Sequence, residues 1–131
     1  GHAAAVERAS AACLARGAKR AVALPVSAPF HSPLMRPARD RMAELLAATR
    51  FSDAAVPVVT NVDALVVNEG ARLSDSLVRQ IDSPVRWVES VRLLAEEGVD
   101  RAIEIGPGSV LAGLVRRIDR GIRVESSSGA A

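Results

Sequence analysis

Short runs of β-branched residues alternate with longer stretches in which apolar residues recur at helical spacing, and this alternation constrains the fold most. Gly or Pro separates most of these stretches. Apolar residues at helical spacing occupy 3–16, 32–46, 74–81, 83–97 and 109–119, and the runs typical of strands lie at 21–27, 56–61, 101–105 and 122–124. Helices that alternate with short strands are typical of an α/β protein with a largely parallel sheet.

Turn and cap signals set the expected limits of these elements. Ser32-Pro33 and Ser83-Pro84 each place a capping residue before a proline that suits the first helical position. Gly106-Pro107-Gly108 predicts a tight turn, after which Ser109 is expected to cap the next helix. The tail at 126–131 is expected to fray.

Composition excludes several classes of protein. The chain has 131 residues, of which 49% are hydrophobic and 24% charged, which is the balance of one soluble globular domain. No apolar run reaches the roughly 18 residues of a membrane span, and no secretory leader is recognisable. A single cysteine, Cys13, and two histidines exclude an internal disulfide and a zinc or iron–sulfur site, so no metal is expected.

The charge balance argues against nucleic acid as a partner. The chain has seventeen basic and fifteen acidic side chains, for a net charge of only +2. It has two Phe, one Trp and no Tyr, so few aromatic rings are present on which nucleic-acid bases could stack. A group of arginines near the C-terminus is interpreted as a solvated helix face: Arg116, Arg117, Arg120 and Arg123. For Arg116 and Arg117, docking of an acidic protein partner is an equal alternative.

His31 is the most informative candidate for chemistry. It lies on a predicted bend after a strand and before a helix cap, where α/β proteins present functional groups. Its ordinary pKa suits a general base, and a histidine that merely fills space is the alternative. Ser32 is assigned to capping rather than to a Ser–His pair. Cys13 falls on the apolar stripe of its helix and is expected to be buried.

Five ordered blocks, at 17–35, 56–63, 77–80, 83–87 and 103–111, resemble the malonyl-CoA:acyl carrier protein transacylases. The first contains Pro29-Phe30-His31-Ser32-Pro33, and the last contains Glu104-Ile105-Gly106-Pro107-Gly108. Members of that family move a malonyl group from coenzyme A to the phosphopantetheine thiol of acyl carrier protein through an ester on a serine. The resemblance therefore implies a cytoplasmic acyltransferase of fatty-acid biosynthesis, with malonyl-CoA as substrate and no cofactor.

Individual site residues follow from the same resemblance. His31 matches the base that activates the serine and then the thiol, and Gln80 matches a residue whose backbone carbonyl orients the imidazole. Phe30 resembles a residue associated with malonyl rather than branched substrates, and Asn61 is a further substrate-binding candidate. Docking of the acidic carrier protein is expected to use Lys19 and Arg20.

The family's nucleophile is not in this chain. Its G-H-S-x-G motif, its oxyanion-hole glutamine and the arginine that pairs with the malonyl carboxylate have no counterpart here. The implied fold is the α/β fold of an acyltransferase, with half of a ferredoxin-like small subdomain at 1–27, part of a hydrolase-like large subdomain at 28–125, and a tail at 126–131. The missing N-terminal part of the same enzyme is then a required partner.

Two further interpretations stay open. One is a segment of an acyltransferase domain in a polyketide or fatty-acid synthase; an end soon after Val124 favours the discrete enzyme instead, since a synthase domain would continue into a linker. The other is a non-catalytic module that binds a carrier protein or another partner. An in-frame G-H-S-x-G upstream would separate the enzyme from the binding module. None of the three predicts nucleic acid or membrane binding.

Overall fold

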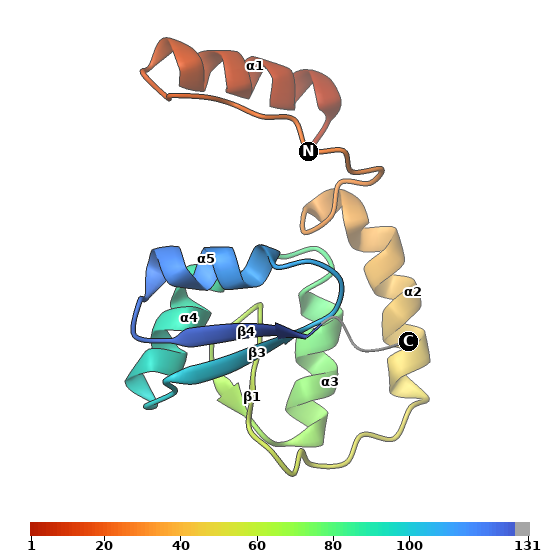
Figure 1. Ribbon diagram of the computed structural model, residues 1–131. Coiled ribbons are helices and arrows are strands. Elements are labelled where there is room, and N and C mark those ends of the chain that lie inside the picture. The colour runs from red at the N-terminus through yellow and green to blue at the C-terminus, as the bar shows by residue number, and fades with distance from the viewer. Residues whose placement is uncertain (128–131) are drawn as a thin grey trace. The chain divides into compact units, whose positions relative to one another are not determined.

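The computed structural model describes residues 1–127 and contains both helices and strands, which confirms the α/β class (Figure 1). The elements follow in chain order as α1 (Ala3–Ala15), the 3-10 helix η1 (Pro33–Met35), α2 (Arg36–Ala47), β1 (Val58–Val59), β2 (Val66–Val67), α3 (Gly70–Arg79), α4 (Trp87–Glu96), β3 (Arg101–Ile105), α5 (Val110–Ile118) and β4 (Arg123–Ser127).

Contacts between residues divide the chain into two compact units. Unit 1 contains residues 1–50 and 77–84, and unit 2 contains 51–76 and the residues that follow 84. Helix α3 therefore begins in unit 2 and ends in unit 1. Neither unit ends at the expected limit between 27 and 28, and the assignment of 1–27 and 28–125 to two subdomains stays a prediction.

The first helix of unit 1 is not part of a core. None of the residues of α1 is buried, Leu14 is 48% exposed, and Cys13 is exposed as well. The expectation that Cys13 is buried is therefore wrong for this chain. An apolar stripe becomes core only where another element covers it, and nothing in residues 1–127 covers this one.

The expected strand at 21–27 does not form. This segment has no regular secondary structure, and Val22 and Leu24 are 68% and 72% exposed. A strand exists only as part of a hydrogen-bonded ladder, and within residues 1–127 no other segment pairs with this one. The β-branched composition indicates a strand, but it does not supply the partner.

In the described part of the chain the strands form two separate pairs instead of one largely parallel sheet, so that prediction is wrong. Strands β1 and β2 are antiparallel, with Val58 opposite Val67. Strands β3 and β4 are parallel, with Arg101 opposite Arg123. The sequence did not predict β2, because its two valines end a run of only four apolar residues, 64–67, which is too short to show an alternating pattern.

Several limits of elements also differ from expectation. Helix α3 begins at Gly70 rather than near 74, because the Asp53 carboxylate accepts a hydrogen bond from the Gly70 amide at 2.9 Å. Helix α4 begins at Trp87 rather than at Ser83-Pro84. Strand β4 extends to Ser127, so the expected fraying at 126 and 127 is wrong, and the rest of that tail lies outside the described residues.

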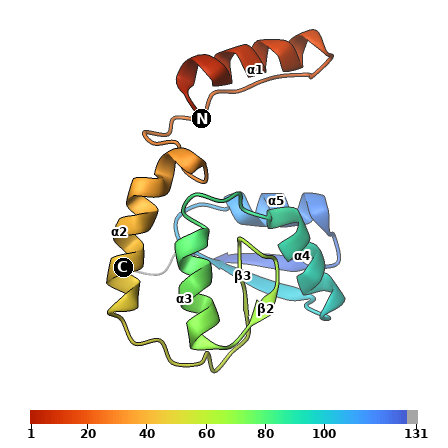
Figure 2. The same cartoon turned by 180° about the vertical axis from the view of Figure 1, so that it is seen from behind.

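The core of unit 2 lies between its last two helices and the parallel strand pair (Figures 1 and 2). Val91 of α4, Val115 of α5 and Ile122 before β4 are its buried centre. Partly buried neighbours complete it: Trp87, Leu94, Ala95, Ala102, Ile118 and Val124. Helix α5 joins β3 to β4, and this crossover is what a parallel pair requires.

The Glu104 carboxylate, rather than the expected Ser109 hydroxyl, caps the N-terminus of α5. Ser109 occupies the cap position but makes no side-chain capping bond. The Glu104 carboxylate of β3 accepts instead, from the Leu111 amide at 3.0 Å and the Ala112 amide at 2.9 Å. These amides are free at a helix N-terminus, where negative charge is also favourable. Glu104 therefore joins β3 to α5.

Replacing Glu104 by Gln should destabilise unit 2. The amide keeps one acceptor oxygen, turns a donor toward a backbone N–H and removes the negative charge, so we expect a loss of about 1–2 kcal/mol in the free energy of unfolding. Urea unfolding followed by circular dichroism measures it. Glu125→Gln is the matched control, because its ion pair with Arg101 is exposed. Equal effects of the two substitutions would contradict the capping role.

The parallel strand pair has an apolar face that residues 1–127 leave uncovered. Ile103 and Ile105 of β3 are 65% and 83% exposed, whereas Ala102 and Glu104, which point to the other face, are partly buried.

Within residues 1–127, every helix is too short or too polar to cross a lipid bilayer.

Candidate active site

His31 has an unusual backbone conformation. Its φ angle is +56°, in the left-handed region that few residues other than glycine occupy. Such a conformation costs on the order of 1 kcal/mol and persists where surrounding structure imposes it, often at a functional site. The sequence predicted a bend here but not this conformation.

Within residues 1–127, one hydrogen bond holds the imidazole of His31. Its Nδ1 lies 2.9 Å from the backbone carbonyl oxygen of Gln80. A carbonyl oxygen can only accept, so Nδ1 donates and carries the proton in the neutral ring. The lone pair is then on Nε2, and the side chain is exposed. This is the tautomer in which Nε2 can remove a proton from another group.

The segment that carries the Gln80 carbonyl is attached to α2 by ion pairs. Gln80 directly follows α3, and two residues later the Asp82 carboxylate accepts a hydrogen bond from Arg39 Nη1 at 3.1 Å. Arg36 Nε lies 3.8 Å from the same carboxylate, whose side chain is only 11% exposed. His31, α2 and residues 77–84 all belong to unit 1. The ion pairs therefore stabilise the segment that orients His31.

Arg39 is a supporting residue that the sequence did not reveal. A hydrogen bond to Asp40, followed by the charge of Asp82, raises its pKa above the ordinary value, so it stays cationic. It is 43 residues from Asp82 in sequence. No local pattern indicates such a distant pair.

Ser32 does not pair with the histidine next to it. Its hydroxyl donates to the Pro29 carbonyl oxygen at 2.7 Å, which closes the bend before η1. It precedes η1 as expected but makes no side-chain capping bond, so the predicted capping role is wrong. The proline at the start of η1 has no amide hydrogen to donate, which removes one of the donors that a cap satisfies.

The other candidate binding residues are all exposed: Lys19, Arg20, Phe30 and Asn61. Phe30 is 56% exposed, and Lys19 and Arg20 are exposed and make no ion pair within residues 1–127. Asn61 belongs to unit 2, where its carbonyl oxygen accepts from the Arg86 amide at 2.8 Å. In the described part of the chain, no three metal-ligating side chains come together. The binding roles of the four named residues stay predictions.

No family model matches this chain. Curated proteins are similar to it in sequence over most of its length. The malonyl CoA-acyl carrier protein transacylase of Salmonella typhimurium is 53% identical over 118 residues, which are 90% of this chain and 38% of that protein. The transacylase of Bacillus subtilis is 49% identical over 90% of this chain and 37% of its own length. The chain is homologous to a C-terminal portion of the malonyl CoA-acyl carrier protein transacylases. It spans about 38% of the length of the transacylases that it matches.

Solved transacylase structures extend the similarity to the fold. The chain matches a malonyl-transacylase, solved in complex with its type II PKS acyl-carrier protein, with a TM-score of 0.94 and 44% identity over 99% of this chain and 42% of that one. It matches the acyl-carrier-protein S-malonyltransferase of Burkholderia pseudomallei with a TM-score of 0.91 and 49% identity over 96% of this chain and 41% of that one.

Proposed function

We propose that this chain is part of an enzyme that transfers a malonyl group from malonyl-CoA to acyl carrier protein in fatty-acid biosynthesis. His31 supplies the general base, and a serine outside this chain supplies the nucleophile. The homology to transacylases supports the reaction. The observation that supports the role of His31 is its hydrogen bond to the Gln80 carbonyl, which leaves Nε2 unprotonated.

In the first half of the proposed reaction, Nε2 of His31 removes the proton of the serine hydroxyl as its oxygen attacks the thioester carbonyl carbon. The tetrahedral intermediate then expels the coenzyme A thiolate, which receives the proton from the imidazolium. A malonyl-serine ester results. In the second half, Nε2 removes the proton of the carrier protein's thiol, the sulfur attacks the ester, and the serine oxygen regains its proton.

A neutral carbonyl is an adequate partner for this histidine. It fixes the proton on Nδ1 and points Nε2 outward, as the aspartate does in a hydrolase triad. It stabilises the transient imidazolium less than a carboxylate would. Thiols, with a pKa of about 8.5, are far more acidic than water. The second half-reaction therefore needs a weaker base than hydrolysis does.

Binding of the acyl group and the carrier protein would use several exposed residues. Phe30 directly precedes His31, so its ring is suited to select the malonyl group over branched acyl groups. Asn61 is the further candidate for substrate binding. Lys19 and Arg20, which lack acidic partners within residues 1–127, are suited to attract an acidic carrier protein.

The proposal is tested by assaying the intact polypeptide that contains this chain for transfer of malonyl groups to holo acyl carrier protein. The product is identified by the mass of the acylated carrier, and the apo carrier without phosphopantetheine is the control. Specific transfer supports the proposal. Binding of the carrier without any transfer would instead identify a non-catalytic module. Comparing carriers from fatty-acid and polyketide synthases tests the polyketide alternative, because one similar transacylase was solved with a type II PKS carrier.

Charge reversal at Lys19 and Arg20 should weaken transfer to the carrier protein alone. We expect Lys19→Glu with Arg20→Glu to raise KM for carrier protein on the order of tenfold and to flatten its salt dependence, because the two cations attract an acidic surface. Steady-state assays at several salt concentrations measure both effects.

The matched control reverses the same number of charges at Arg8 of α1 and at Arg16, the residue that follows this helix. Turnover with a small thiol acceptor should barely change in either double variant. If the Lys19 and Arg20 substitutions impair the small acceptor as much as the carrier protein, the pair supports folding and the docking role is wrong.

A further inference from the structure

Unit 2 contains a hollow with a strongly basic lining. It lies between α5 and β4 and has a volume of about 700 Å³. Four arginines, Arg116, Arg117, Arg120 and Arg123, surround apolar side chains that include Ile122 and Val124. The volume is within the range of sites that bind small molecules, roughly 300–1,000 Å³.

The positive charges at the hollow have no acidic partner within residues 1–127. The two nearest carboxylates in the sequence are engaged elsewhere. Asp119 accepts from the Gly121 amide at 2.7 Å, and Glu125 pairs with Arg101 at 3.0 Å on the far side of the strand pair. Arg116, Arg117 and Arg120 are neighbouring cations that repel one another, so an anion in the hollow would be bound favourably, whereas Arg123 lies on the same face of β4 as Glu125.

The end of the helix explains only part of this cluster. Arg116 and Arg117 lie in the last turn of α5, where cations are favourable because of the helix dipole. Arg120 and Arg123 lie beyond that turn, and the dipole effect decays within it. The cluster therefore exceeds what stabilisation of the helix requires.

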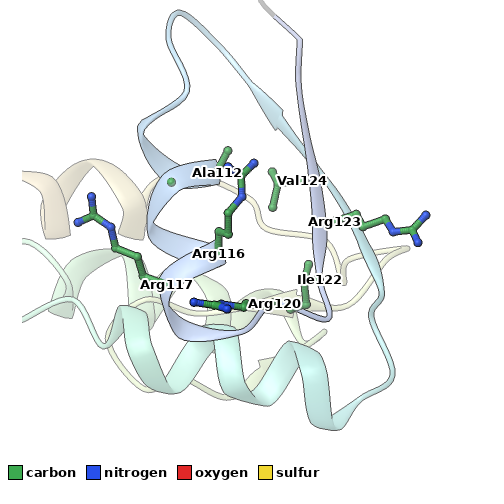
Figure 3. A pocket seen from close by; sticks show the side chains of 8 residues that line it. Ala112, Arg116, Arg117, Arg120, Ile122, Arg123 and Val124 are labelled. Atoms are coloured by element: carbon green, nitrogen blue, oxygen red, sulfur yellow. The ribbon is translucent and has the colours of Figure 1, made fainter.

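Figure 3 shows how the side chains are directed. Arg116 extends from α5 toward Val124 of β4, and Arg120 runs along the lower side of α5 with its guanidinium group directed away from Ile122, whereas Arg117 and Arg123 point outward on opposite sides. A ligand between α5 and β4 would thus meet Arg116 directly, and Arg120, which also lines the hollow, would reach it from the lower side of α5. Arg117 would raise the local positive potential further.

We propose that this hollow binds a phosphorylated small molecule. Its phosphates contact the guanidinium groups of Arg116 and Arg120, and its less polar body lies against Ile122 and Val124. Planar guanidinium groups match phosphate oxygens in pairs. A ligand with at least two negative charges suits several unpaired cations better than a monocarboxylate does. The concave shape and apolar floor favour a small molecule over the surface of a protein.

The first experiment measures binding of ADP, pyrophosphate and adenosine to the intact polypeptide by calorimetry. We expect ADP to bind, pyrophosphate to bind more weakly because it lacks the apolar body, and adenosine not to bind. Arg116→Gln with Arg120→Gln should raise the Kd for ADP at least about tenfold, since two charge-assisted contacts are lost. The control, Arg8→Gln with Arg92→Gln, removes two exposed charges outside the hollow and should change Kd less than about twofold.

A second measurement keeps the inference testable if the double variant does not fold. In the unaltered protein, ADP should protect Arg116 and Arg120 from phenylglyoxal, as peptide mass spectrometry can show, but should not protect Arg92. No ADP binding, or binding that neither depends on these arginines nor protects them, would overturn the proposal. Arginine-dependent binding of polyglutamate without binding of ADP would also overturn it and would identify a surface for acidic proteins.

Discussion

The isolated 131-residue chain, incubated with labelled malonyl-CoA, is expected to remain unlabelled. Covalent transfer needs an activated nucleophile, and the chain has no G-H-S-x-G sequence. Ser32, which directly follows the base in the sequence, donates a hydrogen bond from its hydroxyl to the Pro29 carbonyl oxygen. A base without a nucleophile forms no acyl-enzyme, so the expected loss of labelling is complete.

Acid-quenched samples, separated on a denaturing gel and analysed by mass spectrometry, measure the covalent label. The intact polypeptide that contains this chain is the positive control and should form a labile malonyl ester. A labelled serine within the isolated chain would show that the nucleophile lies here after all. It would contradict the division of roles between His31 and an external serine.

Replacement of His31 in the intact polypeptide should reduce malonyl transfer by a factor of about 10²–10⁴, which is the usual effect of losing a general base. Two variants separate chemistry from folding. Alanine removes the base and occupies the left-handed conformation poorly, whereas asparagine tolerates a φ of +56° and retains an amide that can donate to the Gln80 oxygen. Neither variant can accept the proton of a thiol or of a serine.

Both variants should therefore lose activity to a similar extent, while His31→Ala should also lower the melting temperature more than His31→Asn does. Transfer rates and thermal unfolding measure the two effects separately. Added imidazole should partly restore activity in the alanine variant, in which the ring leaves a space. If His31→Asn retains activity within a few-fold of the unaltered enzyme, the histidine has a structural role only.

Local patterns in the sequence predicted the elements that have a long apolar pattern bounded by turn residues. The helix expected at 109–119 is found at Val110–Ile118, and the strand expected at 101–105 is β3 itself. Both have the apolar spacing and the flanking glycines that signal these elements. Elements that are very short, that lack a partner, or whose limits are set by a residue outside the element were predicted less well. The strand at 21–27 lacks a partner, β2 was missed, and α3 begins where Asp53 caps it.

The candidate site shows the same distinction. The position of His31 on a bend was predicted from neighbouring residues, but its pairing with Gln80 was implied only by the resemblance to transacylases. The hydrogen bond itself is present in the structure. The ion pair of Arg39 with Asp82 and the left-handed backbone at His31 were not predicted, because they depend on the approach of segments far apart in the chain.

The separation of His31 and Gln80 has a consequence for synthesis on the ribosome. Gln80 follows His31 by 49 residues, and the whole excursion of residues 51–76 into unit 2 lies between them. At an elongation rate of about 5–20 residues per second, the histidine leaves the ribosome roughly 2–10 s before its carbonyl partner. During that interval neither tautomer of the imidazole is selected by Gln80. A nascent chain that terminates within the excursion carries the histidine without the carbonyl that selects its tautomer.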